Sequence, residues 1–424
     1  MPESVRAAIR RIFGADLSVV EATQRILDDV RLQGDRAIIR YIRDIDGLLI
    51  EDSTFDMEVS RAEIASSYSQ VEPTVIDALQ LAAGRVRSYH QRQLEHSIRS
   101  FRNRNLGQIV RPLSRVGIYV PGTKVVYPST VLMTAIPARV AGVAEVWMST
   151  PCAPGGEVSP LKLVAADIAG VDRVFRVGGV PAIAAFAYGT ESISAVDKIC
   201  GPGNVFVTAA KKLVYGFVGV DGIFGPSETL VIADESARAH LVAADLLAGA
   251  EHDEQATAML ITTSASLATK VQDSLRKNVS ALPRREAALT ALRGQGVIAV
   301  VSALSEALEI ANQFAPEHLC LHVANPEACL DLITNAGSVF LGQSSVESIG
   351  DYTAGPSHVL PTGGASRFSS PLGVGDFLKI TNVISLDAKA ASDLGPAAAT
   401  IARAEGLLGH ALAIEDRLEG EGRL

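Results

Sequence analysis

Acidic side chains stand next to imidazoles at several places in the chain, a combination that can serve both proton transfer and metal binding. Glu317 and His318 are neighbours in a Pro-Glu-His-Leu motif that follows a helix-like segment. Asp351 precedes His358 by seven residues in a loop-like stretch rich in glycine and proline. An imidazole titrates near neutral pH, and a carboxylate beside it can act on a second proton. The Glu317–His318 pair is therefore a candidate for general acid–base chemistry.

A metal site could draw on three residues that are far apart in the sequence: His252, Asp351 and His410. Zinc favours imidazole nitrogen and carboxylate oxygen, and a catalytic zinc site keeps one position open. No two of these residues have the His-Glu-x-x-His spacing that places two ligands on one helix. The residues alone therefore fit either a metal site or scattered surface histidines. The histidines without an obvious partner, which we interpret as structural, are His90, His96, His240 and His322.

Three glycine-rich loops could bring the backbone close to a phosphate: residues 119–123, 177–181 and 200–204. Each follows a β-rich run and precedes a helical segment, whose N-terminus favours negative charge. No Gly-x-Gly-x-x-Gly motif follows any of the expected strands, so the usual dinucleotide fingerprint is absent. The loops by themselves fit a nucleotide site and ordinary tight turns equally well.

Hydrophobic periodicity indicates the elements that must position these residues. Residues 1–100 have apolar residues at three- and four-residue spacing, with Gly34 as a break, and predict amphipathic helices. From residue 108, short β-rich runs alternate with alanine-rich helical stretches, and from residue 228 the alternation begins again. This pattern predicts an α/β fold with mainly parallel sheets and helices on their faces. Residues 395–415 predict one long alanine-rich helix or a pair of helices.

Length and composition are those of a globular chain. With 424 residues, 48% of them hydrophobic and 20% charged, the chain is large enough for two or more domains. The net charge of −9 argues against nucleic acid or an anionic membrane as a partner. The first residues lack the apolar core of a secretory signal, and no apolar run reaches membrane-spanning length. We therefore expect a cytoplasmic protein whose four cysteines are free thiols that fill the core.

Several long segments also occur, in this order and spacing, in the histidinol dehydrogenase family. They are RVGIYVPG with YPSTVLMTAIPARVAG, VDKICGPGNVFVTAAKKLV, GPSETLVIADES, AEHD, FAPEHL and GDYTAGPSHVLPTGGASRFSSPLGVGDFLK. The resemblance runs from about residue 16 to about residue 412, and the combination is highly specific because most of the segments are long. The chain thus resembles this family over nearly its whole length.

The resemblance implies two incomplete Rossmann-like domains with helical extensions at both ends. On this basis we expect an N-terminal extension over residues 1–15 and a discontinuous α/β domain over residues 16–118 and 228–372. Residues 119–227 would form the second α/β domain, which binds the nucleotide. Residues 373–424 would cross to a partner subunit in an intertwined homodimer whose active sites are shared between the subunits.

The family's chemistry implies one zinc ion per subunit and two NAD molecules per turnover. The small-molecule substrate, L-histidinol, is oxidised to an aldehyde and then to L-histidine, which ends histidine biosynthesis. Matched residue by residue, His318 takes the hydroxyl proton and Glu317 activates water for the second half. The zinc ligands match His252, Asp351 and His410; the substrate contacts match Ser227, His318, Asp351, His358, Glu405 and His410; and the cofactor contacts match Tyr119 and Asn204. Asn204 also suits a left-handed position in its Gly-Pro-Gly-Asn turn.

The chain departs from the family pattern at a few positions. Gly249 stands three residues before His252, where the family usually has a glutamine, and Pro181 stands where a glutamine usually contacts the cofactor. We expect weaker zinc and NAD binding from these changes, although water can complete a zinc site and proline suits the first turn of a helix. Thr123 and Ser357 replace a usual glycine and a usual asparagine.

Three hypotheses about function follow. The first is the activity of the family itself, which the RFSSPLGV segment favours. The second is a related dehydrogenase that oxidises another polar alcohol, such as an amino alcohol or a small anionic diol, which Gly249 and Pro181 favour. The third is a non-catalytic relative that binds a metal or ligand, and the intact Glu317 and His318 argue against it.

Overall fold

The computed structural model describes residues 3–49, 55–122 and 126–418. The chain divides into two compact units. Unit 1 comprises Met1–His96 and Leu113–Phe377, and unit 2 comprises Ser97–Pro112 and Leu378–Leu424. Among the described residues, no helix combines the length and the apolar composition needed to cross a membrane.

Unit 1 begins with the helices that the sequence predicts for its first hundred residues. They are α1 (Glu3–Phe13), α2 (Val19–Gln33), α3 (Asp35–Tyr41), α4 (Arg61–Ser67) and α5 (Pro73–Glu95). A capping box starts α2, because the side chains of Ser18 and Glu21 each accept from the other residue's backbone N–H. Gly34 ends α2, as the sequence predicts, with a φ of 55°.

A five-stranded parallel sheet follows, in the strand order β5-β4-β3-β6-β7. Its strands are β3 (Arg115–Tyr119), β4 (Glu145–Ser149), β5 (Arg173–Phe175), β6 (Lys198–Cys200) and β7 (Gly219–Val220). They alternate along the chain with α6 (Pro128–Ala141), α7 (Pro160–Ala169), α8 (Gly179–Tyr188) and α9 (Val205–Val214). The strand order reverses between β3 and β6, so the loops after these strands flank a switch point, where open parallel sheets bind ligands.

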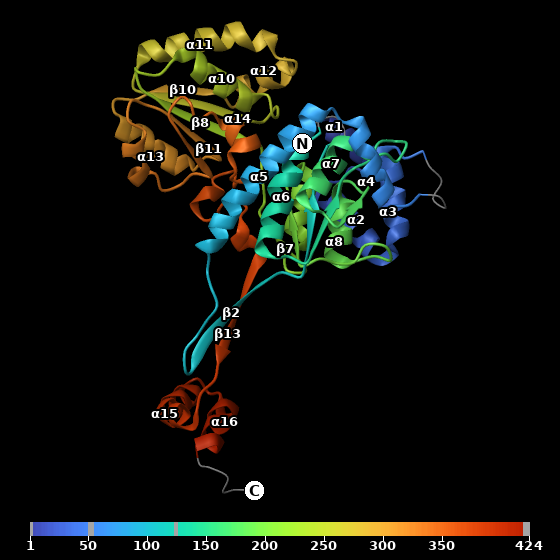
Figure 1. Cartoon of the computed structure of the whole chain (residues 1–424), viewed down its shortest axis with the longest axis vertical. Coiled ribbons are helices and arrows are strands. Elements are labelled where there is room, and N and C mark those ends of the chain that lie inside the picture. The colour runs from blue at the N-terminus through green and yellow to red at the C-terminus, as the bar shows by residue number, and fades with distance from the viewer. Residues whose placement is uncertain (1–2, 50–54, 123–125, 419–424) are drawn as a thin grey trace. The chain divides into compact units, whose positions relative to one another are not determined.

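The second five-stranded parallel sheet has the order β10-β9-β8-β11-β12. Its strands are β8 (Glu228–Ala233), β9 (Thr257–Thr262), β10 (Val297–Val300), β11 (His318–His322) and β12 (Ser338–Leu341). Helices α10 (Ala239–Ala250), α11 (Ala265–Asn278) and α12 (Arg285–Gly294) cover one face, and α13 (Leu304–Phe314) covers the other (Figure 1). Side chains alternate accordingly, since Val231 packs toward the first group and Ile232 toward α13.

Unit 2 consists of three antiparallel strands and two helices. Strands β1 (Phe101–Arg102), β2 (Leu106–Pro112) and β13 (Leu378–Ile384) pair in the order β1-β2-β13. Helices α15 (Ala388–Ala404) and α16 (Leu408–Leu418) pack through Ala399, Ala402 and Ala411. The alanine-rich C-terminal segment is therefore a pair of helices, which is one of the two predicted forms.

The mixed α/β architecture with parallel sheets is confirmed, and several details differ from the expectations. Periodicity does not identify β10, β12 or the strands of unit 2. Strand β3 spans the expected domain boundary between residues 118 and 119, so this boundary falls inside one strand. The domain boundaries otherwise stay a prediction. The four cysteines are free and buried, as expected.

A buried ion pair fixes the loop after β6, which is one of the glycine-rich loops. Lys211 in α9 forms an ion pair with Asp221 and donates to the backbone oxygen of Gly201 at 3.0 Å. The second carboxylate oxygen of Asp221 accepts from the Gly201 N–H at 2.7 Å. Both charged side chains are buried, and Gly201 has a φ of 110°, which favours glycine. The loop is therefore held on both sides of Gly201.

We expect Lys211→Met to lower the free energy of unfolding by about 3–5 kcal/mol, because it leaves the buried Asp221 carboxylate unpaired. Lys212→Met is the matched control, since Lys212 is the exposed neighbour on the same helix and its loss should change stability little. Denaturant titration of both variants measures the difference. Equal stability of the two variants would show that the ion pair does not hold the loop.

Candidate active site

His318 begins β11, and the turn before it has an unusual backbone. Helix α13 ends at Phe314, and Ala315 has a φ of 55°, the only positive φ outside glycine among the described residues. Pro316 follows and prevents the helix from continuing. A left-handed alanine costs about 1–2 kcal/mol, and such strain concentrates at functional sites. The turn delivers Glu317 and His318 to the place where β11 pairs with β8.

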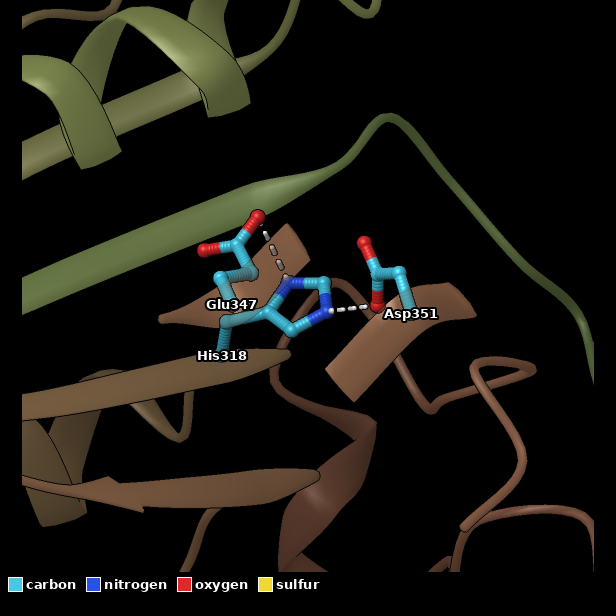
Figure 2. A group of neighbouring side chains, drawn as sticks. All are labelled: His318, Glu347 and Asp351. Carbon is cyan, nitrogen blue, oxygen red and sulfur yellow. Dashed lines mark ion pairs between the residues drawn. The ribbon is translucent and has the colours of Figure 1, made fainter. Parts of the chain in front are cut away.

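The imidazole of His318 is buried between polar groups from separate segments. Nδ1 lies 3.3 Å from the backbone oxygen of Glu228, which can only accept, so Nδ1 carries the ring proton. Nε2 lies 3.4 Å from Oδ1 of Asp351 (Figure 2). Within the described part of the chain, Nε2 makes no hydrogen bond. When the ring is neutral, the lone pair of this buried nitrogen can take a substrate proton or bind an ion.

Four carboxyl groups gather around this ring: Glu228, Glu317, Glu347 and Asp351. Glu317 Oε2 accepts from the backbone N–H of Glu228 at 2.9 Å and lies 3.7 Å from Nδ1 of His318. Glu347 Oε1 also lies 3.7 Å from Nδ1, whereas Asp351 approaches the opposite nitrogen (Figure 2). The ring is therefore flanked by negative charge on both of its nitrogens.

Burial and mutual charge set the protonation of this cluster. Burial raises the pKa of Glu317 and the pKa of Glu347 to about 7 each. Burial alone would lower the pKa of His318, but the neighbouring carboxylates, with Glu347 and Glu317 first, outweigh it and raise that pKa to about 10. Burial also raises the pKa of Asp351, yet the adjoining His318 ring lowers it further, so this pKa is below its usual value. One imidazolium thus faces four carboxyl groups, and the cluster favours an additional cation.

Two further predicted residues adjoin Asp351. The backbone oxygen of Asp351 lies 2.8 Å from Nδ1 of His358, whose Nε2 lies 3.2 Å from Oγ1 of Thr130 in α6. The charge of Asp351 also acts on His252, which stands just after α10. Desolvation lowers the pKa of both imidazoles, so both are neutral near neutral pH, the state that binds a metal. The structure thus brings His252, His318, Asp351 and His358 into one neighbourhood.

The donor atoms in this neighbourhood fit a divalent cation. Ligand atoms of His318, Glu347 and Asp351 all lie within 4.8 Å of one another. Imidazole nitrogen and carboxylate oxygen form a donor set that zinc accepts. Nε2 of His318 makes no hydrogen bond to a described residue, and buried carboxyl groups outnumber the imidazole. Both observations indicate that this cluster favours a bound cation.

Glu347 is a site residue that the sequence-based prediction misses. It begins α14 (Glu347–Ile349), which continues without a break into a π-helical turn over Gly350–Ala354. Asp351 therefore lies in a helical stretch and not in the loop that the sequence suggests. A spacing of four residues places Glu347 and Asp351 on one face of that stretch. This acidic pair, four residues apart, is the signal that could have identified Glu347.

The predicted cofactor residues lie at the carboxyl ends of β3 and β6, beside the switch point of the first sheet. Tyr119 ends β3, and its hydroxyl accepts from the backbone N–H of Gly179 at 3.0 Å. Asn204 caps α9, with its side-chain oxygen 3.1 Å from each of two backbone nitrogens. Its φ is −71°, so the left-handed interpretation of Asn204 is wrong, and helix capping explains the residue instead. Pro181 lies in the first turn of α8, where proline is tolerated.

The sequence also matches a family model over most of its length. The model described as histidinol dehydrogenase matches residues 12–418. The chain belongs to the histidinol dehydrogenase family. A histidinol dehydrogenase of Dehalococcoides mccartyi is 47% identical over 419 residues, which cover 99% of this chain and 95% of the relative. One of Dechloromonas aromatica is 49% identical over 396 residues, covering 93% and 91% of the two chains.

A solved structure of the family agrees with the fold. The crystal structure of histidinol dehydrogenase from Elizabethkingia anophelis superposes on this chain with a TM-score of 0.88 at 34% sequence identity. The match covers 99% of this chain and 96% of that one. The shared architecture therefore extends over both units of the chain and not over one domain alone.

The remaining predicted residues have the following places. Ser227 directly precedes Glu228 at the start of β8, and the Ser357 hydroxyl donates to the backbone oxygen of Met133 at 3.0 Å. Glu405 follows α15 and His410 lies in α16, both in unit 2, so their part in the site stays a prediction. Thr123 lies outside the described residues. Among the histidines interpreted as structural, buried His322 pairs with Asp245 at 3.0 Å.

The glutamine that the family usually has at position 249 would not fit this chain as it stands. A Cβ at Gly249 would lie 2.3 Å from Oγ1 and 2.9 Å from Cβ of Thr229 on β8. Thr229 is buried and branched at Cβ, so it cannot turn away without repacking its surroundings. The missing side chain at position 249 therefore leaves no gap, because Thr229 fills the space.

Gly249→Ala should lower the free energy of unfolding by about 1–3 kcal/mol through overpacking against Thr229, although alanine has the higher helix propensity. Gly84 in α5 is the matched control, because a Cβ there meets nothing within 4 Å. Gly84→Ala should raise stability by about 0.5–1 kcal/mol. Denaturant titration of both variants measures the direction of each change in the free energy of unfolding. A Gly249→Ala variant that is more stable than the parent would refute the packing of Thr229 against position 249.

Proposed function

We propose that this chain oxidises L-histidinol to L-histidine through the aldehyde, with two molecules of NAD reduced per turnover. The observation that carries the proposal is the buried Glu317–His318 pair, held beside Asp351 in a chain that belongs to the histidinol dehydrogenase family. One imidazole and one carboxylate side by side suit a two-stage oxidation, because the first stage removes a hydroxyl proton and the second stage adds the oxygen of water.

In the first stage His318 acts as the general base. In the neutral ring, Nδ1–H faces the backbone oxygen of Glu228, which leaves the lone pair of Nε2 for the substrate. Because the neighbouring carboxylates raise the pKa of the ring to about 10, a bound cation would be needed to keep it neutral near neutral pH. As the carbon-bound hydrogen leaves as hydride to NAD, the hydroxyl proton passes to Nε2, and the products are aldehyde, NADH and a protonated His318. The carboxylates around the ring stabilise that imidazolium, which makes the proton transfer more favourable.

In the second stage Glu317 acts on water. Its carboxyl is buried with a pKa of about 7, so it can accept a proton near neutral pH more readily than an exposed carboxylate. The water oxygen adds to the aldehyde carbon as Glu317 takes one of the two water protons, the anion of the hydrate gives hydride to a second NAD, and the carboxylic acid so formed loses its proton to solvent. The carboxylate of L-histidine and a second NADH are released.

We assign the zinc site to His252, Asp351 and His410, with one ion per subunit. Two of these residues, His252 and Asp351, act on each other electrostatically in unit 1, and His410 lies in unit 2. When bound, zinc would supply a positive charge that helps to hold and orient the nitrogen-bearing substrate. The proposed substrate contacts are Ser227, His318, Asp351, His358, Glu405 and His410.

We assign the NAD site to the first sheet, within residues 119–227. Tyr119 and Asn204 flank its switch point. The ion pair of Lys211 and Asp221 fixes the loop after β6, which leads to Asn204. Loops of this kind bind the cofactor of open α/β enzymes. Pro181 has no amide to offer the cofactor, so we expect NAD to be held by fewer contacts than in relatives with glutamine there.

We further propose a homodimer in which residues 373–424, most of which belong to unit 2, contribute to a shared active site. The support is a set of exposed large apolar side chains in unit 2: Ile380, Ile384, Leu386, Leu394, Ile401, Leu408 and Leu412. Exposed large apolar side chains are the kind of surface that a subunit interface buries. The four cysteines of the chain are free, and we propose on this basis that the enzyme acts in a reducing cytoplasm.

A second candidate function is the oxidation of another polar alcohol by the same machinery. Gly249 and Pro181 favour it, because both remove side chains that the family usually places toward zinc and NAD. The acid–base pair does not distinguish the two substrates. A substrate that offers fewer nitrogens to the metal than L-histidinol would fit the altered ligand set.

The zinc-loaded enzyme should produce two NADH per L-histidinol, and His318→Ala should lower the rate by about 100- to 10,000-fold while leaving the oligomeric state unchanged. His240→Ala is the control, since His240 is exposed on α10 and outside the site. Absorbance of NADH and size-exclusion chromatography measure both properties. If His318→Ala turns over nearly as fast as the parent enzyme, His318 is not the general base. If the parent enzyme does not oxidise L-histidinol, the second class of substrate is favoured.

A further inference from the structure

The space beside position 249 is occupied by a hydroxyl group that points into the acidic cluster. Thr229 Oγ1 lies where a Cβ at Gly249 would be, 2.3 Å away. The same hydroxyl donates to Oε2 of Glu347 at 2.9 Å, and both residues are buried. The absence of a side chain on Gly249 therefore gives Thr229 room to hold a carboxylate that the sequence-based prediction does not include.

Glu347 is placed to do more than fill the core. Its side chain is only 3% exposed, and its sole hydrogen bond among the described residues runs from Thr229 to one oxygen. The second oxygen, Oε1, lies 3.7 Å from Nδ1 of His318, and no described residue donates a hydrogen bond to it (Figure 2). A carboxylate that is largely removed from water is unfavourable unless a positive charge lies nearby.

The geometry points to a cation as that charge. The donor atoms of Glu347, Asp351 and His318 lie within 4.8 Å of one another. Nε2 of buried His318 makes no hydrogen bond to a described residue, and Oδ1 of Asp351 lies 3.4 Å from it. Glu347 and Asp351 come from one helical stretch, four residues apart, so a single short element presents two carboxylates to the same imidazole, one beside each of its nitrogens. The Thr229 hydroxyl donates to one oxygen of Glu347 and leaves the other for the ion, and such a hydrogen bond orients a carboxylate that binds a metal.

We propose that Glu347 is a ligand of the zinc ion in this chain, held in place by Thr229, and that it supplies the oxygen donor that Gly249 cannot. The inference rests on the proposed zinc dependence and adds a residue to the proposed set of His252, Asp351 and His410. Because a carboxylate replaces a neutral amide, the site carries one more negative charge than a site with glutamine at position 249. It should therefore hold a divalent cation firmly without that glutamine.

Zinc affinity measured by chelator competition tests the proposal without any need for turnover. Glu347→Gln should weaken zinc binding by about 100-fold or more, and Thr229→Val, which removes only the hydroxyl, should weaken it by about 10-fold. With cobalt in place of zinc, the visible spectrum of Glu347→Gln should change because a ligand has been lost. Glu309→Gln is the control, since Glu309 is an exposed glutamate on α13.

Two comparisons separate this inference from the function on which it rests. Asp351→Asn should lose zinc whether or not Glu347 is a ligand, so full zinc affinity in that variant would overturn the proposed zinc site itself. Loss of zinc in Asp351→Asn together with unchanged affinity and cobalt spectrum in Glu347→Gln would overturn only the role of Glu347. Should Glu347→Gln fail to fold, Glu347→Asp and Thr229→Val decide the question. Glu347→Asp keeps a carboxyl group at this position, and Thr229→Val keeps the volume of the threonine side chain.

Discussion

The burial of several carboxyl groups beside one imidazole is the constraint on which the rest of the site depends. Glu317, Glu347 and Asp351 lie within 4 Å of His318, and burial by itself opposes the ionised form of each. Mutual charge keeps the imidazole protonated unless another cation balances the carboxylates. A bound divalent ion would free His318 to act as a base, so metal binding and proton transfer are coupled through the same charges.

The scaffold meets this constraint with two sheets that present their functional groups at opposite strand ends. In the first sheet, Tyr119 and Asn204 follow the carboxyl ends of β3 and β6, as expected for a nucleotide site. In the second sheet, Glu228 and His318 begin their strands, so the acid–base cluster lies at the amino ends of β8 and β11. The strained Ala315 turn belongs to this arrangement, because it places His318 on the first position of a central strand.

Much of the fold can be predicted from the sequence, because helices and parallel strands leave local periodic patterns in the chain. The pairing of Glu317 with His318 is visible because the two residues are adjacent. The packing of Thr229 against Gly249 joins residues twenty positions apart on different elements, and no local pattern predicts it. The β2–β13 ladder joins segments still farther apart. Glu347 is missed for a third reason, since the stretch before Asp351 looks like a loop from its composition but is helical.

An anomalous X-ray map collected at the zinc edge from crystals of the zinc-loaded protein tests most directly whether a metal ion balances the buried carboxylates. We expect one strong peak per chain in the acidic cluster, with oxygen atoms of Asp351 and Glu347 and a nitrogen of His252 at about 2.0–2.2 Å from it. Any ligand from unit 2 would appear in the same map. A peak elsewhere, or a cluster with no zinc and an enzyme that still turns over, would contradict the claim that a metal ion balances the buried carboxylates.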